Sequence, residues 1–300
     1  MCFSRSLIAC LYASESLKLA MQQSGYAAGQ EEVEDVQDLR TVSSTLLAWL
    51  KDVWRLTPQL PLELEFKRRQ DLLIALRMAA MGELAGCGAN SEEDPLELLQ
   101  APSISHSHSQ PPWNVLTLEY QYRSSCTEST VPMADIEYQE AKTCLLNLYV
   151  DTNTQNVSVQ DLIKRYFGEI HPEFDGKSTP CQLEMHPCCA GTKVTQLVCI
   201  KEPEILVLQI MRWKWAFDAN QAVRSRVILK MPEEGNCLKL PVKICAHQVI
   251  DAKSHCCICK VHRLHGTEDV DYEVNAAIVR TGEESVTGHY FALIKIRHEW

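Results

Sequence analysis

Two residues near opposite ends of this 300-residue chain have the type and setting needed for thiol chemistry. Cys2 directly precedes apolar residues at helical spacing, which places its sulfur at the N-terminus of a predicted helix. The partial positive charge at that end favours the thiolate and lowers the pKa of the cysteine. Far along the chain, Gly288 forms a turn that delivers His289 to the start of an apolar run of β character. A base on a strand that faces a nucleophile at a helix end is the arrangement required for nucleophilic catalysis by cysteine.

The sequence around these two residues resembles a known family. Cys2–Tyr12 (CFSRSLIACLY) is similar to the cysteine box of ubiquitin-specific proteases, in which a cysteine and an aromatic residue precede an apolar helix with a second Cys-Leu. Tyr272–Ile294 (YEVNAAIVRTGEESVTGHYFALI) resembles the histidine box of the same family. Between them, Ser91–Leu99 (SEEDPLELL) is similar to the family's Gln-Gln-Asp-Ala-x-Glu-Phe-Leu element. Pro203–Trp213 (PEILVLQIMRW) resembles its Pro-x-x-Leu strand, and the four stretches follow in the family's order.

The resemblance implies a single catalytic domain over residues 1–300 with a papain-like α+β fold of the ubiquitin-specific protease type. We expect a helical thumb over about residues 1–110. Fingers and a connecting helix would follow over 111–200, and a β palm carrying His289 over 201–300.

The implied activity is hydrolysis of the isopeptide or peptide bond after the C-terminal Gly-Gly of ubiquitin. Cys2 would attack the carbonyl of the last glycine while His289 accepts its proton, and His289 would then protonate the leaving lysine amine. Water would hydrolyse the thioester that remains, and no cofactor is required for this catalysis. The expected partners are ubiquitin or ubiquitinated proteins.

Several further residues are implied in substrate binding. Asp94, Glu97 and Glu93 would face the arginines of the Leu-Arg-Leu-Arg-Gly-Gly tail of ubiquitin, because charge-assisted hydrogen bonds favour such pairs. Acidic residues also suit a solvated helix start, so both interpretations stay open. Gly288 and Tyr290 are the other predicted substrate-binding residues.

Two parts of the family's machinery are missing from the pattern. The asparagine that normally precedes the nucleophile is absent because only Met1 stands before Cys2, and loss of one oxyanion donor costs about 10²–10³ in rate. The third triad residue would follow Trp300, so the sequence is expected to be clipped at both ends. A catalytically impaired ubiquitin-binding scaffold, and a protease specific for SUMO or another ubiquitin-like protein, are therefore alternatives.

The family's fingers bind a structural zinc through two Cys-x-x-Cys pairs, and this sequence keeps only part of that pattern. Cys126 stands at the first pair and has lost its partner, whereas Cys181, His186 and Cys189 lie in the second region. The ligand types suit tetrahedral zinc, and a metal-free remnant is the alternative.

Two other His-containing stretches could bind metal. Cys256 and Cys259 with His262 or His265, and with Cys245 or His247, could form a second zinc site. A zinc-binding interaction protein built on these Cys and His clusters is therefore a further alternative function. We favour a strand hairpin there, with alternating cysteine and histidine faces. His106 and His108 are interpreted as solvated residues of an irregular connector, Ala101–Pro112.

Composition excludes some classes of function. The net charge of −10 argues against a nucleic-acid-binding protein, which needs a basic face. No apolar run reaches the roughly 18–20 residues that cross a bilayer, so we expect no membrane segment. The opening residues do not read as an export signal, and the 14 cysteines are expected to be reduced thiols in a cytoplasmic or nuclear monomer.

The elements that would position these residues fall into two halves. Helical spacing predicts an opening helix with a slip near Ser14–Ser16, then helices over Ser44–Trp54 and Phe66–Leu84. A later helix is expected over Ser158–Tyr166 with Ser158 as its N-cap. The predicted strands are Val115–Tyr122, Cys144–Val150, Val194–Ile200, Ile205–Ile210, Val227–Leu229, Leu238–Cys245, Tyr272–Val279 and Tyr290–Ile296. A helical half followed by an antiparallel sheet is an α+β architecture.

Overall fold

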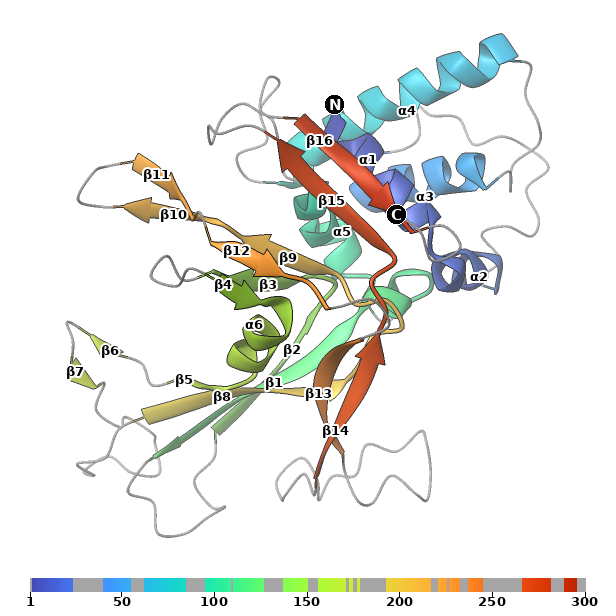
Figure 1. Ribbon diagram of the computed structural model, residues 1–300. Helices are drawn as coiled ribbons and strands as arrows, with labels where there is room; N and C mark the ends of the chain where they lie inside the picture. The colour runs from blue at the N-terminus through green and yellow to red at the C-terminus, as the bar shows by residue number, and fades with distance from the viewer. Residues whose placement is uncertain are drawn as a thin grey trace.

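The computed structural model describes residues 2–23, 40–54, 62–84, 95–108, 110–126, 137–150, 156–170, 173–174, 177–178, 193–216, 221–225, 227–232, 237–244, 266–281 and 289–295. The helices are α1 (Cys2–Tyr12), α2 (Glu15–Gln23), α3 (Val42–Val53), α4 (Leu62–Glu83), α5 (Pro102–Ser105) and α6 (Val159–Tyr166), with 3₁₀ helices η2 (Pro95–Gln100) and η3 (Trp113–Leu116). All except α6 gather in one part of the molecule, as Figure 1 shows.

The strands follow mainly in the second half of the chain. They are β1 (Leu118–Cys126), β2 (Glu137–Thr143), β3 (Leu146–Tyr149), β4 (Asn156–Ser158), β5 (Glu169–Ile170), β6 (Glu173–Phe174), β7 (Lys177–Ser178), β8 (Lys193–Lys201), β9 (Leu208–Met211), β10 (Trp213–Ala216), β11 (Gln221–Arg224), β12 (Ile228–Lys230), β13 (Leu238–Ile244), β14 (Gly266–Tyr272), β15 (Ala276–Thr281) and β16 (His289–Ile294). The predicted α+β class is confirmed.

Local side-chain chemistry sets the starts of the first helices. The predicted slip separates α1 from α2, and Ser14 caps α2 by accepting a hydrogen bond from the Leu17 amide at 3.2 Å. Thr41 caps α3 in a capping box, since its hydroxyl accepts from the Ser44 amide while the Ser44 hydroxyl accepts from the Thr41 amide. The predicted helices α3 and α4 are thus confirmed, each beginning a few residues earlier than expected.

A first hydrophobic core lies inside the helical part. Its fully buried side chains come from α1 to α4, η2, α5 and η3, and include Leu7, Met21, Leu46, Leu72, Leu98, Ile104 and Trp113. Burying a side chain of this size contributes roughly 1.5–3 kcal/mol, so the packing of these faces holds the helices together. The amphipathic spacing that predicted the helices therefore also identifies this core.

The prediction that Ala101–Pro112 is an irregular connector is wrong for residues 101–108, because they include helix α5 and pack against the helical core. Pro102 stands at the start of α5, where a missing amide hydrogen costs nothing, and Ile104 is fully buried. The Glu83 carboxylate accepts hydrogen bonds from the Val42 amide at 2.7 Å and the Ser103 amide at 2.9 Å. One carboxylate at the end of α4 therefore satisfies amides at the starts of both α3 and α5.

The main sheet of the described chain has the strand order β14–β13–β8–β1–β2, with β5 added beside β8. Helix α6 packs on β13 and beside β3 and β4 (Figure 1). Ser158 caps this helix as predicted, accepting from the Asp161 amide at 3.0 Å. A second core forms between them, with Leu162, Ile163 and Leu240 buried.

The expectation of a purely antiparallel sheet is only partly correct. Strands β3 and β9 pair in parallel, as do β4 and β12, and β13 meets β8 in parallel at Val242 and Cys199. Parallel pairs need long crossovers, and these join segments far apart in the sequence. Within the described residues, no helix has the length and apolar character to cross a bilayer.

Candidate active site

Helix α1 and strand β16 form the candidate site. Helix α1 begins at Cys2, strand β16 begins at His289, and the two elements pack against each other. Figure 1 shows both starting at the same end of the packed pair, beside the mark for the N-terminus. The first and last elements of the described chain, which begin at Cys2 and His289, are thus packed against each other. The backbone of Cys2 is described, whereas its side chain lies outside the described part.

Strand β16 holds His289 on its exposed face. Exposure alternates along the strand, so His289, Phe291 and Leu293 share the open face. His289 is paired with Thr281 across the β15–β16 hairpin, and the Thr281 hydroxyl donates a hydrogen bond to the His289 carbonyl at 3.2 Å. Sequence reasoning did not identify this contact of Thr281 with His289, since it depends on the pairing of two strands.

The opposite face of the hairpin packs on the helical core. Ile278 packs against that core and is paired with Ala292, so Tyr290 lies on the same inward face. The Arg280 guanidinium lies over the Tyr290 ring, 5.9 Å from its centroid. Tyr290 and His289 therefore project to opposite faces of β16. Gly288, the other predicted binding residue of this stretch, lies outside the described residues.

The described part of the acidic stretch Ser91–Leu99 packs beside the same helix. Glu97 stands in η2, which packs against α1, and it is partly buried. Leu98 and Leu99 fix η2 by inserting into the core, with 1% of each exposed. Glu93 and Asp94 lie outside the described residues. Of the four stretches that resemble the family, three lie on α1, η2 and β16, and both η2 and β16 pack against α1.

Cys10, the second cysteine of α1, has a different environment from Cys2 at the start of the helix. Cys10 lies near the end of the helix and is half-buried, and this burial raises the pKa of its thiol to about 11. A thiol with so high a pKa is almost wholly protonated at neutral pH and is a poor nucleophile. Of the two cysteines, the one at the helix start has the better electrostatic setting for a thiolate.

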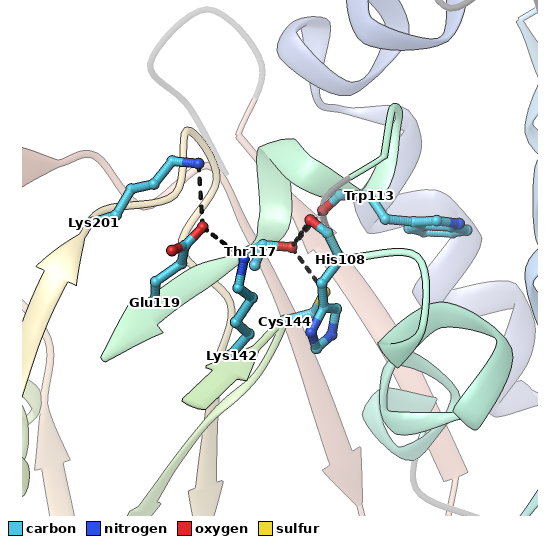
Figure 2. Close-up of polar contacts among 7 residues, drawn as sticks. All are labelled: His108, Trp113, Thr117, Glu119, Lys142, Cys144 and Lys201. Carbon is cyan, nitrogen blue, oxygen red and sulfur yellow. Dashed lines mark hydrogen bonds and ion pairs between the residues drawn. The ribbon is translucent and has the colours of Figure 1, made fainter. Parts of the chain in front are cut away.

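A second cysteine and histidine meet at the start of β1, as Figure 2 shows. The Thr117 hydroxyl lies 2.9 Å from the His108 carbonyl, 3.0 Å from the Trp113 carbonyl and 3.7 Å from the Cys144 sulfur. Burial raises the pKa of the Cys144 thiol to about 11. The expectation that His106 and His108 are both solvated is correct for His106 only, because His108 is half-buried.

The predicted zinc ligands fall mostly outside the described residues. Cys181, His186 and Cys189 are among those residues, as are Cys256, Cys259, His262 and His265. The backbone of Cys126 ends β1 and is paired with Lys193, which follows Cys189 by four residues. Among the residues that the structure does describe, no cluster of three or more His, Cys, Asp or Glu could hold a metal. The zinc site stays a prediction.

Comparisons with known proteins give different results for the sequence and for the structure. The sequence matches no family model and no curated protein. The structure matches the Ubp8/Sgf11/Sus1/Sgf73 DUB module of SAGA bound to ubiquitin aldehyde, with a TM-score of 0.64 and 17% identity over 99% of this chain and 60% of that chain. The same module from yeast with an Sgf73 variant gives a TM-score of 0.61 at 15% identity, over 99% of this chain and 59% of the other.

A further solved structure carries a cysteine-to-alanine substitution in Ubp8 and is bound to monoubiquitin; it matches with a TM-score of 0.62 at 16% identity, over 99% of this chain and 60% of the other. The chain thus spans about 60% of the length of the solved chains it matches. Its α1, η2 and β16 lie within the matched part, because the match extends over almost all of its residues. The chain has the papain-like α+β fold of the ubiquitin-specific protease Ubp8.

Proposed function

We propose that this chain is a cysteine-type deubiquitinase that cleaves the isopeptide or peptide bond after the C-terminal Gly-Gly of ubiquitin. The observation that carries the proposal is the packing of α1, which begins at Cys2, along β16, which begins at His289. The shared fold with a module solved with ubiquitin aldehyde and with monoubiquitin supports ubiquitin as the substrate class.

In the proposed reaction, Cys2 is the nucleophile and His289 the general base. The start of α1 stabilises the thiolate through the partial charge of its free amides. The thiolate attacks the terminal glycine carbonyl, and the C–N bond to the lysine breaks as His289 donates its proton to the leaving amine. Water activated by the neutral imidazole then hydrolyses the thioester and frees both ubiquitin and Cys2.

We further propose that the acidic stretch Ser91–Leu99 binds the ubiquitin tail. Glu97 stands in η2, which packs against the helix that begins at Cys2. A carboxylate there would pair with tail arginines, and Asp94 and Glu93 precede it in the chain. Gly288 and Tyr290 would border the tail on the β16 side. A nuclear or cytoplasmic protein with a structural zinc in the fingers remains the accompanying prediction.

Reaction with ubiquitin carrying a C-terminal electrophile tests the proposal. The full chain should form a covalent adduct, and Cys2→Ala should abolish it. Cys10→Ala is the matched control, because it removes the other thiol of α1 and should leave the adduct intact. Labelling that persists in Cys2→Ala would exclude Cys2 as the nucleophile.

The same chains distinguish the alternatives. Noncovalent binding of ubiquitin without an adduct would identify a ubiquitin-binding scaffold instead of an enzyme. An adduct with a SUMO electrophile but none with the ubiquitin electrophile would change the substrate class and keep the nucleophile.

A further inference from the structure

Helix α4 is apolar on two faces. It has 22 residues, about 33 Å of helix, and packs on α3, which has only 12. Its inner face is buried through Leu72, Leu73, Leu76, Ala79 and Ala80. Its outer face also carries large apolar side chains, since Leu64, Ile74, Met78 and Met81 keep 52%, 55%, 62% and 39% of their surface exposed. A helix that covers a core on one side normally presents polar residues on the other.

The outer residues follow a heptad. Positions 64, 67, 71, 74, 78 and 81 are spaced alternately by three and four residues, which aligns them in one stripe along the helix. Four of the six are the exposed apolar residues, and the other two are Lys67 and Asp71. Such a stripe fits a second helix packed nearly parallel or antiparallel to α4, as in a coiled coil. Figure 1 shows α4 at the outer edge of the helical part.

The charges in the stripe are self-complementary. Within the described chain, neither Lys67 nor Asp71 has an ion-pair partner, whereas the neighbouring cations Arg68 and Arg69 pair with Asp52 and Glu65. In an antiparallel pair of α4 helices, a register that sets Leu64 opposite Ile74 of the copy also sets Lys67 opposite Asp71 of the copy. Two-fold symmetry repeats both contacts, giving two ion pairs between two apolar layers.

We propose that the outer face of α4 is a contact between two copies of this chain, packed antiparallel in this register. This register pairs both charges and covers Leu64 and Ile74, whereas Met78 and Met81 extend beyond the overlap of the two helices. Two helices bury less than the roughly 1,200 Å² of a stable interface, and each chain carries a net charge of −10. The association is therefore weak and concentration-dependent, and it replaces the expectation of a strict monomer.

Sedimentation over a range of concentrations tests the proposal with charge-reversed variants. Lys67→Asp and Asp71→Lys should each lose self-association, with the dimer dissociation constant rising at least about 10-fold, because like charges then oppose each other. An equimolar mixture of the two variants should dimerise again, since each supplies the charge that the other lacks. Lys164→Asp, an exposed residue of α6 with the same charge change as Lys67→Asp, should behave as the unmodified chain.

Circular dichroism confirms that each variant is folded, and the mixture then separates the remaining outcomes. Failure of the mixture to dimerise would overturn the proposed register. A chain that stays monomeric at every concentration would overturn the homodimer.

Discussion

Within the described residues, two regions of the molecule place a cysteine-bearing segment beside a histidine-bearing one, and the two regions differ in burial. At the first, α1 begins at Cys2 beside a strand that begins with the exposed His289. At the second, Cys144 directly follows β2 and is buried, and His108 is half-buried. Thr117 lies between the two residues (Figure 2). The residue types are the same, so the difference lies in where the fold places them.

The electrostatics of the second place oppose proton transfer. Burial raises the pKa of the Cys144 thiol to about 11. Burial also lowers the pKa of His108, and the nearby Lys142 lowers it further. Both groups are therefore held neutral, and the thiolate–imidazolium state is disfavoured. The start of a helix instead favours a thiolate through its partial positive charge, which is why the first region is the candidate active site.

The largest expected effect separates the two histidines. His289→Gln should slow labelling by the ubiquitin electrophile by about 10²–10⁴-fold, the usual contribution of a general base. His108→Gln should leave the labelling rate unchanged, because His108 lies at the sheet and not beside α1. The rate of adduct formation is measured for both variants. A slower rate for His108→Gln than for His289→Gln would contradict the assignment of His289 as the base.

The cysteines provide the next comparison. A thiol with a pKa of about 11 has roughly 100-fold less thiolate near neutral pH than one with a pKa of 9.0. In the folded protein, alkylation of Cys144 by iodoacetamide should therefore be much slower than alkylation of the exposed Cys237, because the Cys144 thiol is both protonated and inaccessible. Peptide mass spectrometry measures both sites, and unfolding in urea should remove the difference. Equal rates in the folded protein would contradict the buried environment of Cys144.

The sequence predicts the helical part of this fold well because helix signals are local. Apolar spacing places α1, α3 and α4, and Ser158 marks the start of α6. Strand pairing is not local. Strand β2 (EYQEAKT) is an edge strand with few apolar residues, so it has no alternating pattern to detect. The parallel pair β3–β9 depends on a crossover that no single stretch encodes.

The same distinction applies to the site. Cys2 and His289 stand in recognisable stretches, and the fold packs the elements that begin with them. Thr281 and His108 could not be found in this way. Thr281 contacts His289 only through strand pairing, and His108 stands in a Ser- and His-rich stretch that has the composition of a loop. The docking of that stretch depends on Glu83, about 20 residues earlier in the chain.

Two threonines allow a test in which stability and activity separate. Thr117 is buried and Thr281 is exposed, yet each hydroxyl donates to a histidine carbonyl. Thr117→Val should lower the free energy of unfolding by about 1–3 kcal/mol, because it leaves buried carbonyls unsatisfied, and should not change labelling. Thr281→Val should change stability by less than about 0.5 kcal/mol while slowing labelling. Urea titration and adduct kinetics on both variants measure the two effects. Slower labelling of Thr117→Val would contradict the separation, because it would mean that the region around Thr117 affects the candidate active site.

The smallest expected effect is the pH dependence from His108. Its pKa in the folded protein lies below the ordinary value of 6.5, chiefly because of burial and then Lys142 and His106, with Glu119 acting in the opposite direction. As the pH falls below about 6.5, the unfolded chain binds a proton that the folded chain still resists, so the free energy of unfolding decreases. His108→Gln should make this decrease shallower between about pH 6.5 and 5. Urea titrations across this range measure the slopes. An unchanged slope in His108→Gln would mean that this imidazole is as free to accept a proton in the folded protein as in the unfolded chain, and the contrast with His289 would then rest on geometry alone.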